Sequence, residues 1–413
     1  MEKSLFYELL SGSEYFTLED LRYNKKVGYC FSKEKYETFI AYKKELLCEN
    51  DNIFQKIPLK TFNSKYLFFA DGKYLQSLYN EYLNIVYESE TDDQSNLFSR
   101  NMEDILFSRA VSEVEGTLRI ENVATTQKRI IELYRKEIPE NQNDVIVVNM
   151  INAMKYIVNE KPAFNKENLR KLYCMLSENC LSEEDRLAEG QYYRDGFVQV
   201  DGFEGAEHKE IDTLMDSLFS FVNDKDSLNK YGILLPHICH YYIVYVHPYF
   251  DYNGRTARMV SFWINSLYNE MQGPLFISEA INENKKNYYN ALRETRNNDN
   301  DLTFFLGYIL KTAVKFGYIY KNLEEIKKML SKDGNFLSKS EPFYLKKILI
   351  HNPENYFNTK MFIDYINSGI SHQGVMKILN SLTEKNVLIK GKNKKGEYIF
   401  KVNPNCIFYK YED

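Results

Sequence analysis

Residues 247–258 read His-Pro-Tyr-Phe-Asp-Tyr-Asn-Gly-Arg-Thr-Ala-Arg, and they combine several groups that can handle phosphate. His247 titrates near neutral pH, so it is a candidate general base that takes a proton from an attacking hydroxyl. Asp251 offers the hard oxygen ligands that Mg²⁺ prefers when it also binds substrate phosphates. It is therefore the candidate metal ligand.

The second half of this stretch favours an anion site. Asn253-Gly254 favours a turn with positive φ, and a helix that starts at Arg255 would direct its free backbone N–H groups toward an anion. Arg255 and Arg258 lie three residues apart on one helical face, where both guanidinium groups can bind phosphate oxygens. Two such groups suit a polyphosphate better than a monophosphate.

Apolar segments at residues 231–246 and 259–265 flank the stretch and predict a helix on either side of a loop. In the alternative interpretation, Asn-Gly only turns the chain between two core helices, His247 is a core histidine and the arginines face solvent. The number of complementary groups within one loop makes a functional site the better interpretation.

The loop resembles the signature of the Fic family, His-x-Phe-x-Asp/Glu-Gly-Asn-Gly/Lys-Arg-x-x-Arg. The resemblance implies an all-α core in which the loop joins two helices and transfers AMP from ATP to a hydroxyl of a target protein. It gives His247 the role of base and Asp251 the role of ligand for Mg²⁺ or Mn²⁺. The residues that it places on the nucleotide phosphates are Asn253, Gly254, Arg255 and Arg258.

Two positions depart from the signature. Tyr249 stands where the family has Phe, which is a mild change because an aromatic ring still packs inward. Tyr252 stands where the family has Gly, and a residue with a Cβ atom cannot adopt every backbone conformation that is open to Gly. The form of the anion hole, the nucleotide and the rate are therefore open.

Residues 111–117, Val-Ser-Glu-Val-Glu-Gly-Thr, resemble the inhibitory helix of many Fic proteins. That helix carries Ser/Thr-x-x-x-Glu-Gly/Asn, and its Glu pairs with the last arginine of the active loop. The resemblance assigns Glu115 and Gly116 to this motif, with Arg258 as the partner, although the hydroxyl expected four residues before the Glu is missing. Such a pair would remove one phosphate-binding group. A solvated Glu followed by a Gly cap would give the same letters.

Residues 189–203 alternate aromatic and β-branched side chains between glycines, which predicts a β-hairpin. Their position resembles that of the Fic flap, a hairpin that aligns the target protein by main-chain pairing. The resemblance therefore implies that a target protein docks on residues 189–203, and a plain surface hairpin is the alternative.

Residues 284–296 resemble the helix that lines the adenine site of Fic proteins. Tyr289 and Leu292 share a helical face, where a ring and an aliphatic surface could enclose a base. Core packing explains this spacing more often than a ligand does, so the assignment to the nucleotide pocket rests on the resemblance.

Breaks in the helical pattern divide the 413 residues into three regions. Residues 1–95 have no recognisable motif and form either a small α or α/β module or an extension packed on the core. The catalytic region is expected over 96–330, with the inhibitory helix near 105–117. A third region covers 338–413.

The third region has the pattern of a winged helix-turn-helix domain. Helices are expected over 341–351, 359–367 and 372–385, with Ser371 as the cap of the last, and two strands follow around a lysine-rich turn. The side chains that would meet DNA are His372, Gln373, Lys377, Lys392, Lys394 and Lys395. Winged helices also dimerise or dock proteins, so DNA is one of several open partners.

Overall composition adds few constraints. A formal net charge of -5 gives no global attraction to nucleic acid or membrane. No run approaches the ~20 apolar residues of a membrane-spanning helix, and the N-terminus lacks a secretory signal, so the cytoplasm is the expected location. The six cysteines form no Cys-x-x-Cys pair, which indicates neither a zinc site nor a disulfide framework. The sequence leaves open whether the chain forms a homo-oligomer.

The sequence thus predicts a mainly α protein with a Fic-type core, a short β-hairpin flap and a C-terminal winged helix. By resemblance it is an autoinhibited protein adenylyltransferase that uses ATP and modifies a Ser, Thr or Tyr hydroxyl. Removal of AMP, transfer of another phosphate-containing group, and a DNA-binding regulator with a slow or vestigial site are the alternatives.

Overall fold

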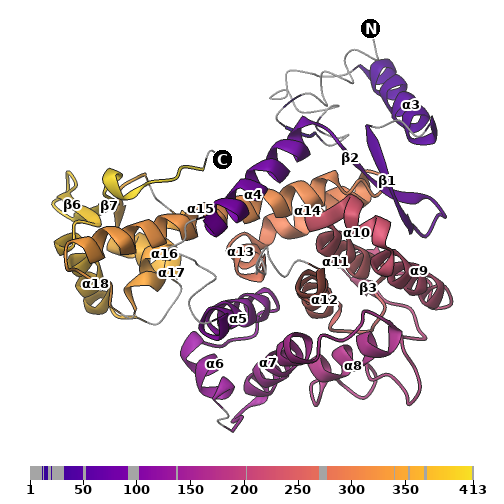
Figure 1. The fold of residues 1–413 in the computed structure, drawn as a ribbon, viewed down its shortest axis with the longest axis horizontal. Helices are drawn as coiled ribbons and strands as arrows, with labels where there is room; N and C mark the ends of the chain where they lie inside the picture. The colour runs from indigo at the N-terminus through magenta and orange to yellow at the C-terminus, as the bar shows by residue number, and fades with distance from the viewer. Residues whose placement is uncertain are drawn as a thin grey trace. The chain divides into compact units, whose positions relative to one another are not determined.

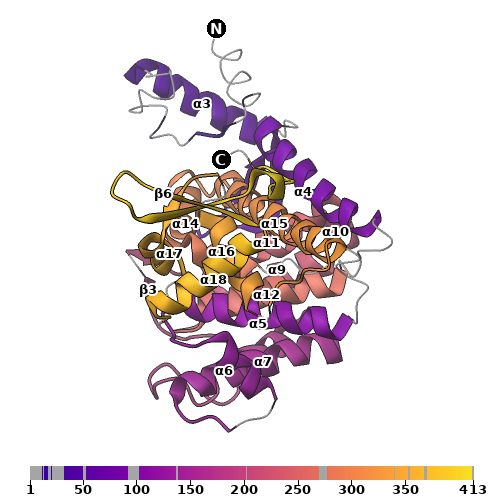
Figure 2. The same cartoon turned by 90° about the vertical axis from the view of Figure 1, so that its left-hand side faces the viewer.

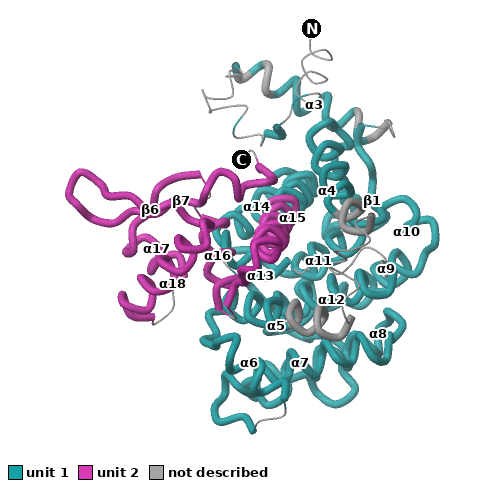
Figure 3. The backbone as a smooth tube through the Cα atoms, turned by 60° about the vertical axis from the view of Figure 1, so that its left-hand side comes forward, with its two compact units in different colours: residues 1–312 teal, residues 313–413 magenta. Residues whose placement is uncertain are grey.

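The computed structural model describes residues 12, 14–16, 20, 32–49, 53–91, 102–135, 138–200, 202–268, 277–338, 340–351, 354–366 and 370–411. Within these residues the chain is mainly α-helical with a few short strands, as the sequence predicts (Figure 1). It divides into two compact units, unit 1 (residues 1–312) and unit 2 (residues 313–413) (Figure 3). The division falls inside helix α15 (Thr303–Lys332), so the domain borders at 95 and 330 stay predictions.

Helices α11 (Leu235–Val246) and α12 (Asn253–Tyr268) form the centre of unit 1. Nearly every side chain of α11 is buried, as expected for a helix that is apolar on all sides. On its other side, α12 packs against α7 (Gln142–Glu160) and α8 (Lys166–Ser177) (Figure 1). Helix α7 also packs against α6 (Gln127–Tyr134) (Figure 2). The buried Trp263 fixes α12 further, because its ring N–H donates to the carbonyl of Pro162 at 2.9 Å.

Helix α5 (Met102–Ile120) lies against α13 (Ile277–Glu283) at unusually close range. Gly116 makes this possible, because a Cβ atom there would lie 2.5 Å from a backbone nitrogen of α13. The buried Glu113 accepts hydrogen bonds from the backbone N–H of Ser278 at 3.0 Å and from its hydroxyl. The middle of α5 is thus fixed to α13.

The N-terminal region contains an antiparallel hairpin of β1 (Phe54–Lys60) and β2 (Tyr66–Ala70), which packs on the helical core. Phe62 at its tip stacks on Tyr245 of α11 with ring centroids 4.1 Å apart. The hairpin therefore contacts the helical core through its tip.

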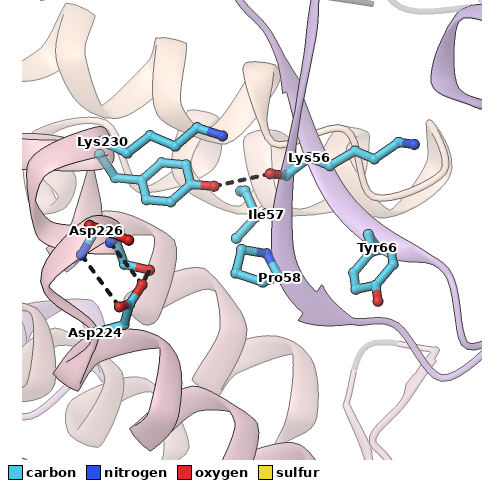
Figure 4. Close-up of a pocket in the computed structure, with 9 residues that line it drawn as sticks. Lys56, Ile57, Pro58, Tyr66, Asp224, Asp226 and Lys230 are labelled. Carbon is cyan, nitrogen blue, oxygen red and sulfur yellow. Dashed lines mark hydrogen bonds between the residues drawn. The ribbon is translucent and has the colours of Figure 1, made fainter. Parts of the chain in front are cut away.

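The remaining elements of unit 1 surround this centre. They are α3 (Lys33–Glu49), α4 (Lys73–Thr91), α6 (Gln127–Tyr134), α9 (Ile211–Asn223), α10 (Lys225–Tyr231), η2 (Gly232–Leu234) and α14 (Lys285–Asn297). A cavity of about 370 Å³ lies between the hairpin and α10, where the hydroxyl of Tyr231 donates to the carbonyl of Lys56 at 3.0 Å (Figure 4). None of its lining residues belongs to the loop 247–258.

Unit 2 contains α16 (Glu341–His351), α17 (Thr359–Ile366) and α18 (His372–Glu384), each within one residue of its predicted bounds. Ser371 caps α18 as expected, since its hydroxyl accepts from the N–H of Gly374 at 3.2 Å. The strands are β5 (Phe357–Asn358), β6 (Leu388–Lys392) and β7 (Tyr398–Val402), in the antiparallel order β5-β7-β6, and η3 (Pro404–Cys406) follows. The assignment as a winged helix stays a prediction. Among the described helices of both units, none is long and apolar enough to cross a membrane.

Candidate active site

The loop between α11 and α12 has an irregular backbone at both ends. α11 ends at His247, which has a φ of 54° and donates its N–H to the carbonyl of Ile243. α12 begins at Asn253 rather than at Arg255. The buried side chain of Asn253 accepts from the N–H of Tyr249 at 3.0 Å and donates to its carbonyl at 2.8 Å. It therefore fixes the loop, and only its backbone remains for an anion.

Arg194, which lies outside the loop, binds two of its carbonyl groups. This residue was not identified from the sequence. Its side chain is buried, and its Nε donates to the carbonyl of His247 at 2.8 Å. Its backbone N–H donates to the carbonyl of Pro248 at 3.0 Å. A charged residue within a run of aromatic side chains was the available signal, because a buried arginine needs several acceptors.

The predicted hairpin is shorter than residues 189–203. Its strands are β3 (Gln199–Val200) and β4 (Phe203–Glu204), which pair antiparallel. Residues 189–198 form no strand, and Arg194 among them donates to the carbonyl of His247. The flap is joined to the end of α11 through Ala206, whose N–H donates to the carbonyl of Val246 at 3.0 Å.

His247 has the protonation state that a general base requires. Burial lowers the pKa of His247 to about 4, and the positive charge of Arg194 acts in the same direction. Its Nδ1 lies 3.3 Å from the carbonyl oxygen of Val244, which favours the tautomer with the proton on Nδ1. The imidazole is therefore neutral near pH 7, with the Nε2 lone pair free to take a proton.

Asp251 presents a carboxylate to solvent beside this base. Its side chain is 57% exposed, one oxygen accepts from the N–H of Tyr252 at 2.6 Å, and the other lies 3.8 Å from Nη2 of Arg255. The described residues contain no cluster of three His, Cys, Asp or Glu side chains that could hold a metal. A cation at Asp251 would take its other ligands from phosphates and water, which fits Mg²⁺ or Mn²⁺.

Tyr252 adopts the backbone conformation that glycine would favour at this position. Its φ is 68°, in the left-handed region. Its ring is 3% exposed, and the guanidinium carbon of Arg255 lies 3.3 Å from the ring centroid. The side chain is thus accommodated within the loop.

The expected pair of Glu115 with Arg258 is wrong. Arg258 is buried and contacts Glu121, with Nη2 2.5 Å from Oε1, while its Nε donates to the hydroxyl of Thr117 at 2.7 Å. Glu115 pairs instead with Arg119 at 2.8 Å, within its own helix. Six residues along a helix amount to about 240° of net rotation at 3.6 residues per turn, so the two carboxylates face different sides.

The pattern Ser/Thr-x-x-x-Glu-Gly/Asn fits a second place in the sequence, at Thr117, Glu121 and Asn122, with the hydroxyl in position. This complete match was the signal that could have found Glu121. Gly116 has a different function, since it allows α5 to approach α13.

The surroundings of Glu121 favour its ionised form. Burial would raise its pKa, but the attraction of Arg258, with Arg255 adding to it, brings the pKa of Glu121 below its ordinary value. Gly254 leaves room for the ion pair, because a Cβ atom there would lie 3.0 Å from Oε1 of Glu121 and 3.3 Å from Nη1 of Arg258. The pair is therefore present at neutral pH.

The two side chains expected at the adenine differ in exposure. Tyr289 is 41% exposed, whereas Leu292 is buried. Their neighbour Tyr288 is also buried, and its hydroxyl lies 2.9 Å from Nε2 of His240. The adenine contacts stay a prediction.

Comparisons with known proteins agree with this geometry. The model of the Fic/DOC family matches residues 163–264, which include the hairpin of β3 and β4 and the whole loop 247–258. The protein adenylyltransferase Fic of Aedes aegypti is 27% identical over 161 residues, or 38% of this chain and 30% of that protein. The protein adenylyltransferase Fic of Drosophila mojavensis is 26% identical over 182 residues, which are 43% of this chain and 33% of that protein. These residues of the chain therefore form a Fic domain.

Two solved Fic structures share the fold. A Fic family protein from Desulfovibrio desulfuricans G20 aligns with a TM-score of 0.51 at 15% identity, over 81% of this chain and 98% of that one. Fic-1 from C. elegans aligns with a TM-score of 0.52 at 18% identity, over 78% of this chain and 85% of that one. The chain spans about a third of the length of the curated relatives that it matches.

Proposed function

We propose that this Fic-family chain is a protein adenylyltransferase that transfers AMP from ATP to a Ser, Thr or Tyr hydroxyl of a target protein. The neutral His247 beside Asp251 and two buried arginines is the observation that carries the proposal. The names of the relatives, each a protein adenylyltransferase, support the same activity.

The chain's own residues divide the reaction between them. Nε2 of His247 takes the proton of the acceptor hydroxyl while its oxygen bonds to the α-phosphorus and the bond to pyrophosphate breaks. Arg255 and Arg258 bind the outer phosphates, and Asp251 would hold a Mg²⁺ or Mn²⁺ ion, which would neutralise phosphate charge. Catalysis then consists mainly of positioning and charge stabilisation.

The same proposal includes autoinhibition by Glu121. Its carboxylate binds the guanidinium of Arg258 in place of the γ-phosphate. It also places a negative charge at the phosphate site. ATP then binds without a contact between its γ-phosphate and Arg258, so the activity is low until Glu121 is displaced.

The target protein would dock beside β3. Val200 on this strand is 43% exposed, and Phe197 just before it is 68% exposed. An extended segment of the target can pair with the backbone there and contact these apolar side chains, which brings its hydroxyl toward His247.

The test uses ATP labelled at the α-phosphate, with self-labelling in place of an unknown target. Glu121→Gly should label at least about tenfold more than wild type, because Arg258 becomes free, which corresponds to about 1.4 kcal/mol. Adding His247→Ala to Glu121→Gly should abolish the label. Equal labelling with and without His247 would contradict the proposal, and absence of label with intact ATP binding would favour AMP removal or another donor.

A second function, DNA binding by unit 2, is supported by its charge. Residues 313–413 contain 17 lysines, no arginine and 10 acidic residues, a net charge of +7. Residues 1–312 carry the opposite sign, since 36 basic residues face 48 acidic ones, a net charge of -12. The turn after β6 exposes Lys394 and Lys395 and is ordered by Asn393, whose side chain accepts from the N–H of Lys395 at 2.9 Å.

DNA binding is tested by fluorescence anisotropy with a labelled random-sequence duplex at low salt. Reversing Lys392, Lys394 and Lys395 to Glu should weaken binding by at least about tenfold, since each phosphate contact contributes counterion release. The matched control reverses Lys327, Lys328 and Lys332 of α15. No binding by the full chain, or equal loss in both triple variants, would rule this function out.

A further inference from the structure

We propose that the ring of Tyr252 is the platform that holds Arg255 in place for the nucleotide phosphates. The proposal rests on the use of Arg255 in the function above and adds Tyr252 as a positioning residue. The family signature has Gly at this place, so the platform is a property of this chain.

The contact has the geometry of a guanidinium stacked on an aromatic face. The guanidinium carbon of Arg255 lies 3.3 Å from the ring centroid of Tyr252, and both side chains are buried, at 7% and 3% exposure. Stacking uses the face of the guanidinium and leaves its N–H groups, which lie in the plane, for hydrogen bonds. Desolvation strengthens such a contact.

The other contacts of Arg255 are weak. Its Nε is buried and has no hydrogen-bond partner among the described residues. Within that same part of the chain, the one carboxylate within 4 Å is that of Asp251, at 3.8 Å. A buried N–H without an acceptor is costly, so the arrangement fits a site that a ligand oxygen completes. Arg258 differs, because Glu121 and Thr117 already accept from it.

The backbone shows that the ring is kept at an energetic cost. A non-glycine residue in the left-handed region is strained, and Tyr252 has a φ of 68°. Hydrogen bonds from its N–H to Asp251 and from the N–H of Thr256 to its carbonyl hold this conformation. Stacking on Arg255 offsets part of the strain that Gly would avoid.

The experiment measures dissociation constants of ATP and of adenosine by calorimetry, with the full chain in the Glu121→Gly background. Tyr252→Phe and Tyr252→Leu both retain a Cβ atom, so the strain at this position is unchanged and only the ring is compared. We expect Phe to bind ATP within about twofold of the parent and Leu to bind it about fivefold or more weakly, with adenosine unaffected.

A double-mutant cycle shows whether Tyr252 acts through Arg255. In a chain that already carries Arg255→Ala, Tyr252→Leu should cause no further loss of ATP affinity. The platform would be overturned if the Phe and Leu variants bound ATP equally well, or if Tyr252→Leu weakened adenosine binding as much as ATP binding. It would also be overturned if Tyr252→Leu caused its full loss of ATP affinity in the Arg255→Ala chain. If Leu unfolds the chain, Tyr252→Met replaces it in the same cycle.

The two proposals fail in different ways. If the Glu121→Gly parent binds ATP no more tightly than adenosine, the phosphate site itself is wrong and the platform falls with it. If the parent prefers ATP but the ring is dispensable, the proposed function stands and only the platform is lost.

Discussion

The middle and the end of α5 have similar sequence motifs, Glu115-Gly116 and Glu121-Asn122, but make different contacts. In the middle, Glu113 and Gly116 face α13, and Glu115 pairs with Arg119 on its own helix. At the end, Thr117 and Glu121 both contact Arg258 of the catalytic loop. The first section fixes the helix and the second one acts on the site.

Helix geometry explains the division. Thr117 and Glu121 lie four residues apart, which places them on one face and allows both to reach the same arginine. Glu115 lies two residues before Thr117, which turns its side chain about 160° away from that face. A Glu-Gly pair within a helix is therefore not evidence of an inhibitory contact unless its face is known.

The largest expected effect concerns Gly116 in the middle section. Gly116→Ala places a Cβ atom 2.5 Å from the backbone of α13, and such overpacking should lower the free energy of unfolding by about 2 kcal/mol. Chemical denaturation measures it, with the half-buried Ser112→Ala on the same helix as the control. Equal stabilities would mean that α5 and α13 do not meet there.

Thr117 at the end of α5 should show the next largest effect. Thr117→Val keeps the shape but removes the acceptor for Nε of the buried Arg258. We expect a loss of about 1.5 kcal/mol in unfolding free energy and a rise of about threefold in self-labelling, because the inhibitory pair is loosened. Thr117→Ser retains the hydroxyl and serves as the control, so a similar rise in both variants would argue against this hydrogen bond.

Glu113 should show its effect as a pH dependence of stability. Burial raises the pKa of Glu113 from 4.5 to about 7, against the hydrogen bonds from Ser278. Because the folded-state pKa is the higher one, its contribution is complete below about pH 4.5 and is lost as the pH rises through 7. Glu113→Gln cannot ionise, so its stability should rise relative to that of wild type as the pH increases from 5 to 8.

Denaturation of both proteins at these two pH values checks the prediction. A difference between Glu113→Gln and wild type that stays constant with pH would show that Glu113 does not titrate in this range.

The catalytic loop and the helices of unit 2 could be predicted because their signals are local. His247, Asp251 and the two arginines lie within twelve positions, and Ser371 marks the start of α18 by its capping chemistry. The hairpin of β1 and β2 was not located, because its local signal is only the weak turn pair Asn63-Ser64.

Glu121 and Arg194 could not be placed because their partners are distant in sequence. Arg194 binds a carbonyl 53 residues further along the chain, and Glu121 binds an arginine 137 residues away. The choice between Glu115 and Glu121 depends on how α5 is rotated against α12, which is a tertiary property. The complete match to the motif at Thr117, Glu121 and Asn122 was the local signal for the second site.

The central claim is that Glu121, and not Glu115, keeps Arg258 from the γ-phosphate. Calorimetric affinities for ATP and ADP should be compared in wild type, Glu121→Gly and Glu115→Gln. We expect wild type and Glu115→Gln to bind the two nucleotides alike, and Glu121→Gly to prefer ATP by about tenfold, since one charge-assisted contact is gained. A preference for ATP that appears in Glu115→Gln, or in neither variant, would contradict the claim.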